Sequence, residues 1–362
     1  MKAKCLNPNS AWICGTIRSK ADGVISPHMV FSPSKALQYY RNILGDNVAA
    51  VEMMRQNEVS VPCGKCMACQ IRKRKDWTTR LSNEASCFDG NCCFITLTYN
   101  DDNVPTTCFN PLNGSVPKMM DRGAGSLPLQ TLLVADVQKF VKRLRSYLEY
   151  VPKIEKNRRG RDYVATPIRY YVCGEYGSKY RRPHYHLLIF GWKPSDMVVF
   201  DIHNGHSIYR SAQLERLWKF GFSTVETVDG GVAKYCSRYV TKKFARLQDV
   251  DPFKDCVFPE FVLQSVRNGG IGATWFDRNL ESCLGKGYVD LQVNGKSYFK
   301  AAIPAYYWRR ARKRRLCLWL QLREERMQLL ARGLPPVSLA ELVRSVQKYE
   351  YGERIASQRE LF

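Results

Sequence analysis

His184 and His186 are the residues whose types and spacing point most directly to chemistry, since this 362-residue chain contains only five histidines. They flank Tyr185 in the apolar run 183–191 (PHYHLLIFG), which predicts a β-strand. Alternate residues of a strand share one face of the sheet, so the two imidazoles should point the same way. Glu175 ends the preceding predicted strand, and antiparallel pairing would bring its carboxylate close to them. This set predicts a site for one divalent metal ion; the alternative is two surface or core histidines without a ligand.

Tyr235 and Tyr239 form a second constellation, on a helix predicted over residues 231–247. Residues four apart lie on one helix face, so the two phenols should project together. A phenol has a pKa of about 10, so attack by its phenolate requires a nearby cation or a metal-polarised electrophile. Lys242 and Lys243 follow in the next turn and are candidates for stabilising a scissile phosphate. The alternative is an amphipathic helix with two packed tyrosines.

Cys63, Cys66 and Cys69 are separated by two residues each, a spacing typical of tetrahedral thiolate sites for zinc. A fourth ligand is needed. Cys5 is the first candidate and Cys14 the second, because both precede the cluster in the N-terminal stretch. The cluster predicts structural zinc rather than catalysis, since no histidine or acidic residue stands beside it in the sequence. The alternative is three reduced thiols packed at the start of a helix.

The N-terminal residues lack the apolar core of a signal peptide, and no stretch approaches the ~18 apolar residues that span a bilayer. We therefore expect a soluble intracellular protein whose 14 cysteines are mostly reduced. The 56 Lys+Arg against 33 Asp+Glu leave a net charge of +23, which predicts a polyanionic partner, because binding releases counterions from nucleic acid. An anionic membrane surface, or a basic enzyme without a polyanion, is the competing interpretation.

A basic block in the C-terminal part follows three aromatic residues, Tyr306, Tyr307 and Trp308. Aromatic rings interleaved with arginine suit base stacking and phosphate contacts on single-stranded DNA. The alternatives are a solvated charged face and packing of the rings inside a helical C-terminal domain. The basic residues expected to contact DNA are Arg309, Arg310, Arg312, Lys313, Arg314 and Arg315.

The segments around these residues alternate between strand and helix patterns. A strand is predicted over 92–99, a helix over 134–150, strands over 168–173 and 185–191, a short helix over 213–220, a strand over 222–228 and the tyrosine helix over 231–247. This order predicts an α+β fold, in which an antiparallel sheet carries helices on one face, of the ferredoxin-like or RNA-recognition-like type.

Three domains are expected along the chain. Residues 1–90 form an irregular N-terminal segment with the cysteine cluster and a basic helix over 70–85. Residues 91–250 form the core that carries the histidines and tyrosines. Residues 251–362 form a basic, mainly helical extension that contains a hairpin over 287–302.

Three sequence motifs together resemble those of HUH endonucleases and occur in that superfamily's order. They are residues 94–98 (FITLT), residues 183–187 (PHYHL) and the tyrosine helix in its two-tyrosine form. A more specific resemblance is to the replication initiators of gokushovirus-type microviruses, small phages with circular single-stranded DNA, through residues 62–69, 173–177 and 182–191. The resemblance covers roughly residues 60–245 and implies that 91–250 is an HUH endonuclease core.

The resemblance implies that the protein initiates rolling-circle replication. It makes His184, His186 and Glu175 ligands of Mg²⁺ or Mn²⁺, of which Mn²⁺ suits imidazole ligands better. It makes one tyrosine the nucleophile that cuts single-stranded origin DNA, leaving a 5′-phosphotyrosine and a 3′-OH that primes a host polymerase. The second tyrosine then re-joins the unit-length circle without ATP. Thr96 and Thr98 of the first motif are expected to contact the DNA.

No G-x-x-x-x-G-K-[ST] motif occurs in the sequence, so strand separation would require a host helicase in the host cell cytoplasm. A plasmid relaxase or a transposase of the same superfamily would differ in partners rather than in chemistry. A non-enzymatic single-stranded nucleic-acid-binding protein is the alternative from another class. A covalent protein–DNA adduct distinguishes the enzymes from the binding protein; no membrane partner is expected, and the oligomeric state is not predicted.

Overall fold

The computed structural model describes residues 5–18, 25–108, 118–119, 129–159, 167–177, 180–203, 205–228, 257–293 and 297–314. They divide into two compact units, one made of residues 1–73 and 309–362 and the other of residues 74–308. The first boundary falls within helix α3 (Met67–Ala85) and the second within helix α8 (Ala305–Arg314). Among the described helices, none combines the length and the hydropathy that crossing a bilayer requires.

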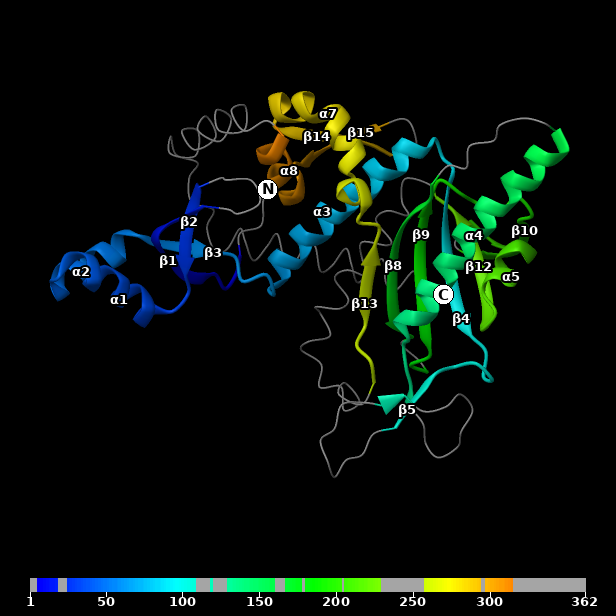
Figure 1. The fold of residues 1–362 in the computed structure, drawn as a ribbon, viewed down its shortest axis with the longest axis horizontal. Coiled ribbons are helices and arrows are strands. Elements are labelled where there is room, and N and C mark those ends of the chain that lie inside the picture. Colours follow the sequence, from blue (N-terminus) through cyan, green and yellow to red (C-terminus); the bar gives the residue numbers. More distant parts are fainter. Residues whose placement is uncertain are drawn as a thin grey trace. The chain divides into compact units, whose positions relative to one another are not determined.

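A seven-stranded antiparallel sheet forms the centre of the larger unit (Figure 1). In spatial order its strands are β10 (Val198–His203), β11 (His206–Arg210), β12 (Gly221–Thr227), β4 (Cys92–Tyr99), β9 (Pro183–Phe190), β8 (Arg169–Tyr176) and β13 (Phe261–Gln264). The four predicted strands lie side by side as β12-β4-β9-β8, which is the fourth-first-third-second order of a ferredoxin-like sheet. The predicted α+β fold with an antiparallel sheet is confirmed.

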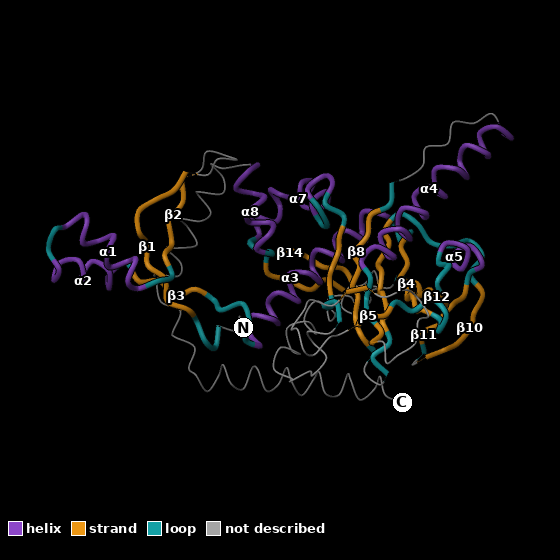
Figure 2. The backbone as a smooth tube through the Cα atoms, turned by 60° about the horizontal axis from the view of Figure 1, so that its bottom comes forward, coloured by secondary structure: helices purple, strands orange, loops and turns teal. Residues whose placement is uncertain are grey.

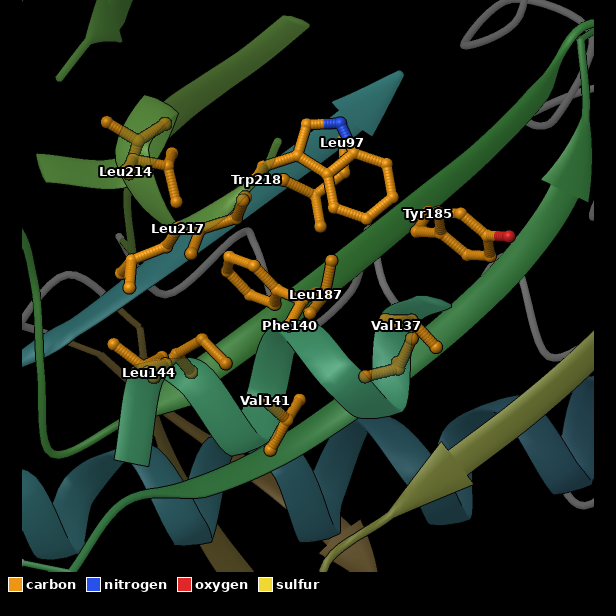
Figure 3. Close-up of a cluster of buried hydrophobic side chains, with 14 of the residues drawn as sticks. Leu97, Val137, Phe140, Val141, Leu144, Tyr185, Leu187, Leu214, Leu217 and Trp218 are labelled. Carbon is orange, nitrogen blue, oxygen red and sulfur yellow. The ribbon is translucent and has the colours of Figure 1, made fainter. Parts of the chain in front are cut away.

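Helices α4 (Val134–Arg159) and α5 (Ala212–Leu217) cover one face of this sheet. Val137, Phe140, Val141 and Leu144 recur at helical spacing, so α4 presents one apolar stripe to the sheet. Figure 3 shows this stripe against the buried side chains of β4 and β9. Trp218, at the C-terminal end of α5, is 1% exposed and lies within the same cluster. Burial of this face holds the central strands in one register.

The opposite face of the sheet is covered at one end by the last turns of α3. Leu81 and the partly buried Trp77 pack against Phe94, Leu188 and Phe190, which are the residues of β4 and β9 that point away from α4. The prediction had all helices on one face; α4 and α5 lie there, whereas α3 packs on the other because its own apolar residues also need burial.

The N-terminal part is not irregular, and this prediction is wrong. Strand β1 (Asn9–Arg18) pairs with β2 (Ile25–Val30) and with β3 (Glu58–Val61), and helices α1 (Pro33–Leu44) and α2 (Asn47–Gln56) lie between β2 and β3 in the chain (Figure 2). The prolines had suggested loops, but Pro27 lies in β2, an edge strand, where a missing N–H is tolerated.

The remaining elements are short or belong to the C-terminal part. Three small strands form a second sheet in the larger unit: β5 (Thr106–Cys108), β6 (Lys118–Met119) and β7 (Leu129–Gln130). The predicted hairpin is confirmed as β14 (Tyr288–Val293) and β15 (Ser297–Ala302). Helix α7 (Ala273–Lys286) precedes it, and single 3-10 turns occur at Ser86–Phe88 and Arg267–Gly269. The helices predicted beyond residue 315 lie outside the described residues.

Candidate functional site

His184 and His186 lie on the α3-covered face of the sheet, beyond the end that the helix covers. The antiparallel register places Thr98 of β4 and Glu175 of β8 opposite His184, and Thr96 opposite His186. Thr98 Oγ1 is 2.9 Å from His184 Nδ1, and Thr96 Oγ1 is 3.2 Å from His186 Nδ1. On the other side of its ring, His186 Nε2 lies 3.1 Å from Glu175 Oε1. The structure therefore brings the predicted histidines and carboxylate together.

Burial keeps the imidazole of His184 uncharged. Desolvation, followed by the charges of His186 and Arg182, lowers the pKa of His184 to about 4, against a smaller opposing effect of Glu175. A neutral imidazole offers a lone pair, which is the form that binds a metal ion. His186 is 9% exposed and its ring stacks on Phe94, with ring centroids 5.7 Å apart. Both rings are thus held in place before any ligand arrives.

Tyr185, between the two histidines, points to the opposite face and anchors the strand. Its hydroxyl accepts a hydrogen bond from the Leu133 N–H at 2.8 Å and lies 2.8 Å from the Tyr99 hydroxyl. The Tyr99 hydroxyl donates to Asp136 Oδ2 at 2.7 Å. All three side chains are fully buried, and desolvation raises the pKa of both phenols. These bonds tie β4 and β9 to the first turn of α4, so the strands that carry the histidines cannot slide.

The donor set of this site fits a divalent metal ion. Two imidazole nitrogens and one carboxylate oxygen are ligands of the kind that bind first-row divalent metals, and hydroxyl partners on the Nδ1 atoms fix the ring orientation. The imidazole rings of His184 and His186 have centroids 6.4 Å apart. Glu175, which is 13% exposed in its side chain, completes the set on the neighbouring strand.

The predicted nucleophiles and their lysines, Tyr235, Tyr239, Lys242 and Lys243, lie outside the described residues. Their position relative to the histidines stays a prediction. The described chain before them ends at Val228, which packs on the same face of the sheet as the two imidazoles.

The basic block begins on α8, and its neighbouring aromatic residues are packed. Tyr307 is fully buried, its ring is stacked on Phe276 with centroids 4.3 Å apart, and its hydroxyl accepts from Asn83 Nδ2 at 3.1 Å. The Arg80 guanidinium lies 4.1 Å from the ring centroid of Tyr306. The packing alternative is therefore right for Tyr307, which cannot stack on a base. Of the basic residues, Arg309, Lys313 and Arg314 are exposed, Arg310 and Arg312 are half-buried, and Arg315 lies outside the described residues.

The four candidate zinc ligands meet at one point. The sulfur atoms of Cys5, Cys63, Cys66 and Cys69 all lie within 4.8 Å of one another, so this group could hold a metal ion. Cys14, the second candidate, is instead buried in the small core of the N-terminal sheet. Proximity in the chain had made both cysteines candidates, and the structure selects Cys5.

Three contributions to the histidine site were missed from the sequence. Thr96 and Thr98 were assigned to DNA, whereas their hydroxyls face the imidazoles. The Tyr99–Asp136 bond that anchors β4 was not foreseen. Arg182 donates to the Tyr99 carbonyl at 3.2 Å and forms an ion pair with Asp101. Aligning the two predicted strands in antiparallel register would have found the threonines, because they alternate as the histidines do.

Comparison with known proteins identifies the class to which this fold and site are related. A family model for replication-associated proteins of the ORF2 type matches residues 92–244. That segment contains the histidine pair as well as the predicted tyrosine helix. No solved structure matches the chain.

Three phage proteins are similar to most of the chain. The replication-associated protein VP4 of Bdellovibrio phage phiMH2K is 29% identical over 269 residues, which cover 74% of this chain and 72% of the relative. The replication-associated protein ORF2 of Spiroplasma virus 4 is 28% identical over 275 residues, 75% of this chain and 74% of the relative. The replication-associated protein ORF4 of Chlamydia phage 1 is 28% identical over 259 residues, 70% of this chain and 54% of the relative. The resemblance to replication proteins of microvirus-type phages is confirmed.

Proposed function

We propose that this protein initiates rolling-circle replication by nicking single-stranded origin DNA through a tyrosine nucleophile and later re-joining the strand. The observation that carries the proposal is the arrangement of His184, His186 and Glu175 on one sheet face, with both Nδ1 atoms held by threonine hydroxyls. The named function of the three phage relatives supports the replication role.

His184, His186 and Glu175 would hold Mg²⁺ or Mn²⁺. The ion supplies polarisation of the scissile phosphodiester when it is bound. Thr98 and Thr96 orient the two imidazoles, and desolvation keeps His184 neutral at physiological pH. We assign the threonines to this positioning role in place of the predicted DNA contact.

Tyr235 or Tyr239 would attack the phosphorus. The new bond joins the phenol oxygen to phosphorus while the bond from phosphorus to the 3′ oxygen breaks; the phenol loses its proton and the 3′ oxygen gains one. The product is a 5′-phosphotyrosine and a free 3′-OH, from which a host polymerase extends. The reverse exchange with the second tyrosine closes the circle without ATP. Lys242 and Lys243 would stabilise the charge on the phosphate.

Single-stranded DNA is the proposed substrate, inside the host cell. The net charge of +23 favours a polyanion, and Arg309, Lys313 and Arg314 are exposed on α8. A host helicase is proposed to separate the strands. A plasmid relaxase or transposase would share this chemistry, but the relatives found are phage replication-associated proteins. The second metal site, at the cysteines, is argued separately below.

The test is formation of a covalent adduct. The full-length protein is incubated with Mn²⁺ and single-stranded oligonucleotides that tile the phage genome, and adducts that survive denaturation are mapped by mass spectrometry. We expect one oligonucleotide to become linked to Tyr235 or Tyr239. The Tyr235→Phe, Tyr239→Phe double variant and His184→Ala should form none, whereas Tyr150→Phe, at an exposed tyrosine of α4, should react normally.

Two results would contradict the proposal. An adduct formed by the double tyrosine variant would exclude these nucleophiles. Absence of any adduct with Mn²⁺ or Mg²⁺ across the whole genome, by folded protein that still binds single-stranded DNA, would favour the non-enzymatic binding protein.

A further inference from the structure

Four cysteine side chains from separate places in the chain converge in the smaller unit. Cys5 comes from the N-terminal segment, Cys63 and Cys66 follow strand β3, and Cys69 lies in the first turn of α3. Cys5 Sγ is 3.4 Å from Cys63 Sγ and 3.6 Å from Cys66 Sγ. In a tetrahedral zinc–thiolate site with Zn–S bonds of ~2.3 Å, sulfur atoms lie ~3.8 Å apart. The spacing in this cluster is thus close to that of a coordinating set and far from the ~2.05 Å of a disulfide.

Backbone amides are aimed at these sulfurs. The N–H of Cys63 donates to Cys5 Sγ at 3.2 Å, the N–H of Cys66 donates to Cys63 Sγ at 3.2 Å, and the N–H of Leu6 donates to Cys66 Sγ at 3.4 Å. Gly64 has φ +75°, a conformation that lets the chain turn between the first two thiols of the cluster. Amide donors favour the thiolate, which is the form that binds metal.

The electrostatics of the cluster also favour a cation at its centre. Burial opposes ionisation of Cys66, but hydrogen bonds from the Leu6 N–H and neighbouring groups outweigh it and lower its pKa to about 6. Burial, followed by the neighbouring thiols, raises the pKa of Cys69 to about 12. One thiolate therefore forms readily and opposes the next. A divalent cation shared by four sulfurs removes this repulsion.

The unit that contains the cluster has a small core. Its buried hydrophobic cluster consists of Trp12, Cys14, Ala36, Tyr40 and Ala50. Two of these five residues are alanines, so little apolar area is buried. Small units of this kind usually need a staple such as a disulfide or a metal. A link from Cys5 to Cys63 would close a loop over both helices and all three strands of the unit, which lowers the entropy of the unfolded chain.

We propose that Cys5, Cys63, Cys66 and Cys69 bind one structural Zn²⁺ that joins the N-terminal segment to the start of α3 and is required for residues 5–73 to fold. Four soft thiolates in tetrahedral spacing select zinc over the Mg²⁺ or Mn²⁺ expected at the histidines. The proposal does not depend on DNA cleavage, because it is tested by metal content and folding.

Metal content is the first measurement. Full-length protein purified without added metal is weighed by native mass spectrometry and its elements are counted by plasma mass spectrometry. We expect one zinc per chain in the wild type and in Cys87→Ser, a half-buried cysteine of the larger unit. The Cys5→Ser variant should fall below about a tenth of an equivalent. Replacement by Co²⁺ should produce the strong visible absorption of a tetrahedral thiolate site.

The folding role is tested on the wild-type chain, so that a variant that fails to fold cannot obscure the result. Zinc is removed with a chelator, and limited proteolysis is followed by mass spectrometry. Cleavage within residues 5–73 should increase at least tenfold, and Zn²⁺ but not Mg²⁺ should restore protection. Iron in place of zinc, a disulfide between any two of these cysteines, or no bound metal would overturn the assignment. Unchanged proteolysis after complete zinc removal would overturn the folding role.

Discussion

Replacing Thr98 with valine tests whether a threonine hydroxyl positions a metal-binding imidazole. The substitution keeps the β-branched shape but removes Oγ1, which lies 2.9 Å from His184 Nδ1. A neutral hydrogen bond contributes about 0.5–1.5 kcal/mol, a factor of roughly 2 to 13 in the population of the oriented ring. Loss of a partner of a ligating histidine typically weakens metal binding by about 10–100-fold. We therefore expect the Kd for Mn²⁺ to rise about tenfold in Thr98→Val.

The assay is a Mn²⁺ titration in which the free ion is followed by electron paramagnetic resonance. Thr98→Ser keeps a hydroxyl and should bind nearly as tightly as the wild type. Thr227→Val, at an exposed threonine of β12, is the matched control and should bind normally. Urea unfolding should show that Thr98→Val loses less than about 1.5 kcal/mol of stability, so that a change in affinity is not a change in folding.

His184→Ala distinguishes the two ways in which this reasoning could fail. If His184→Ala loses Mn²⁺ but Thr98→Val binds as tightly as the wild type, the hydroxyl does not position the ring. If His184→Ala binds Mn²⁺ normally, the metal site itself is wrongly placed.

Two further predictions concern stability. Glu84 is a buried carboxylate that accepts from the Gly272 N–H at 2.5 Å and pairs with Arg169, so Glu84→Ala should lower the free energy of unfolding by about 3–5 kcal/mol in urea, and a loss below about 1 kcal/mol would contradict this. Burial alone would raise the pKa of Asp196, but hydrogen bonds from Ser211 and backbone amides outweigh it and lower the pKa. The stability advantage of the wild type over Asp196→Asn should therefore be complete at pH 7 and shrink as the pH falls below about 4; an equal difference at pH 7 and pH 3 would refute this sign.

Local sequence patterns were sufficient for the central elements of the fold. The run of β-branched and aromatic residues over 92–99 predicted a strand with the bounds that β4 has, and α4 begins at Val134 as its apolar spacing indicated. The three-stranded N-terminal sheet was missed because β1 pairs with β3, which lies beyond two helices in the chain. Such pairing depends on contacts between distant residues, which a window of neighbouring residues does not contain.

The sequence alone determined that His184 and His186 share a face, because a strand repeats every two residues, and that three cysteines have ligand spacing. Only the tertiary structure decided what these residues meet. The register between β4 and β9 places Thr98 opposite His184, and the return of the N-terminal segment selects Cys5 over Cys14 as the fourth cysteine. Both outcomes follow from burial of apolar surface between segments far apart in the chain, which sets register and proximity together.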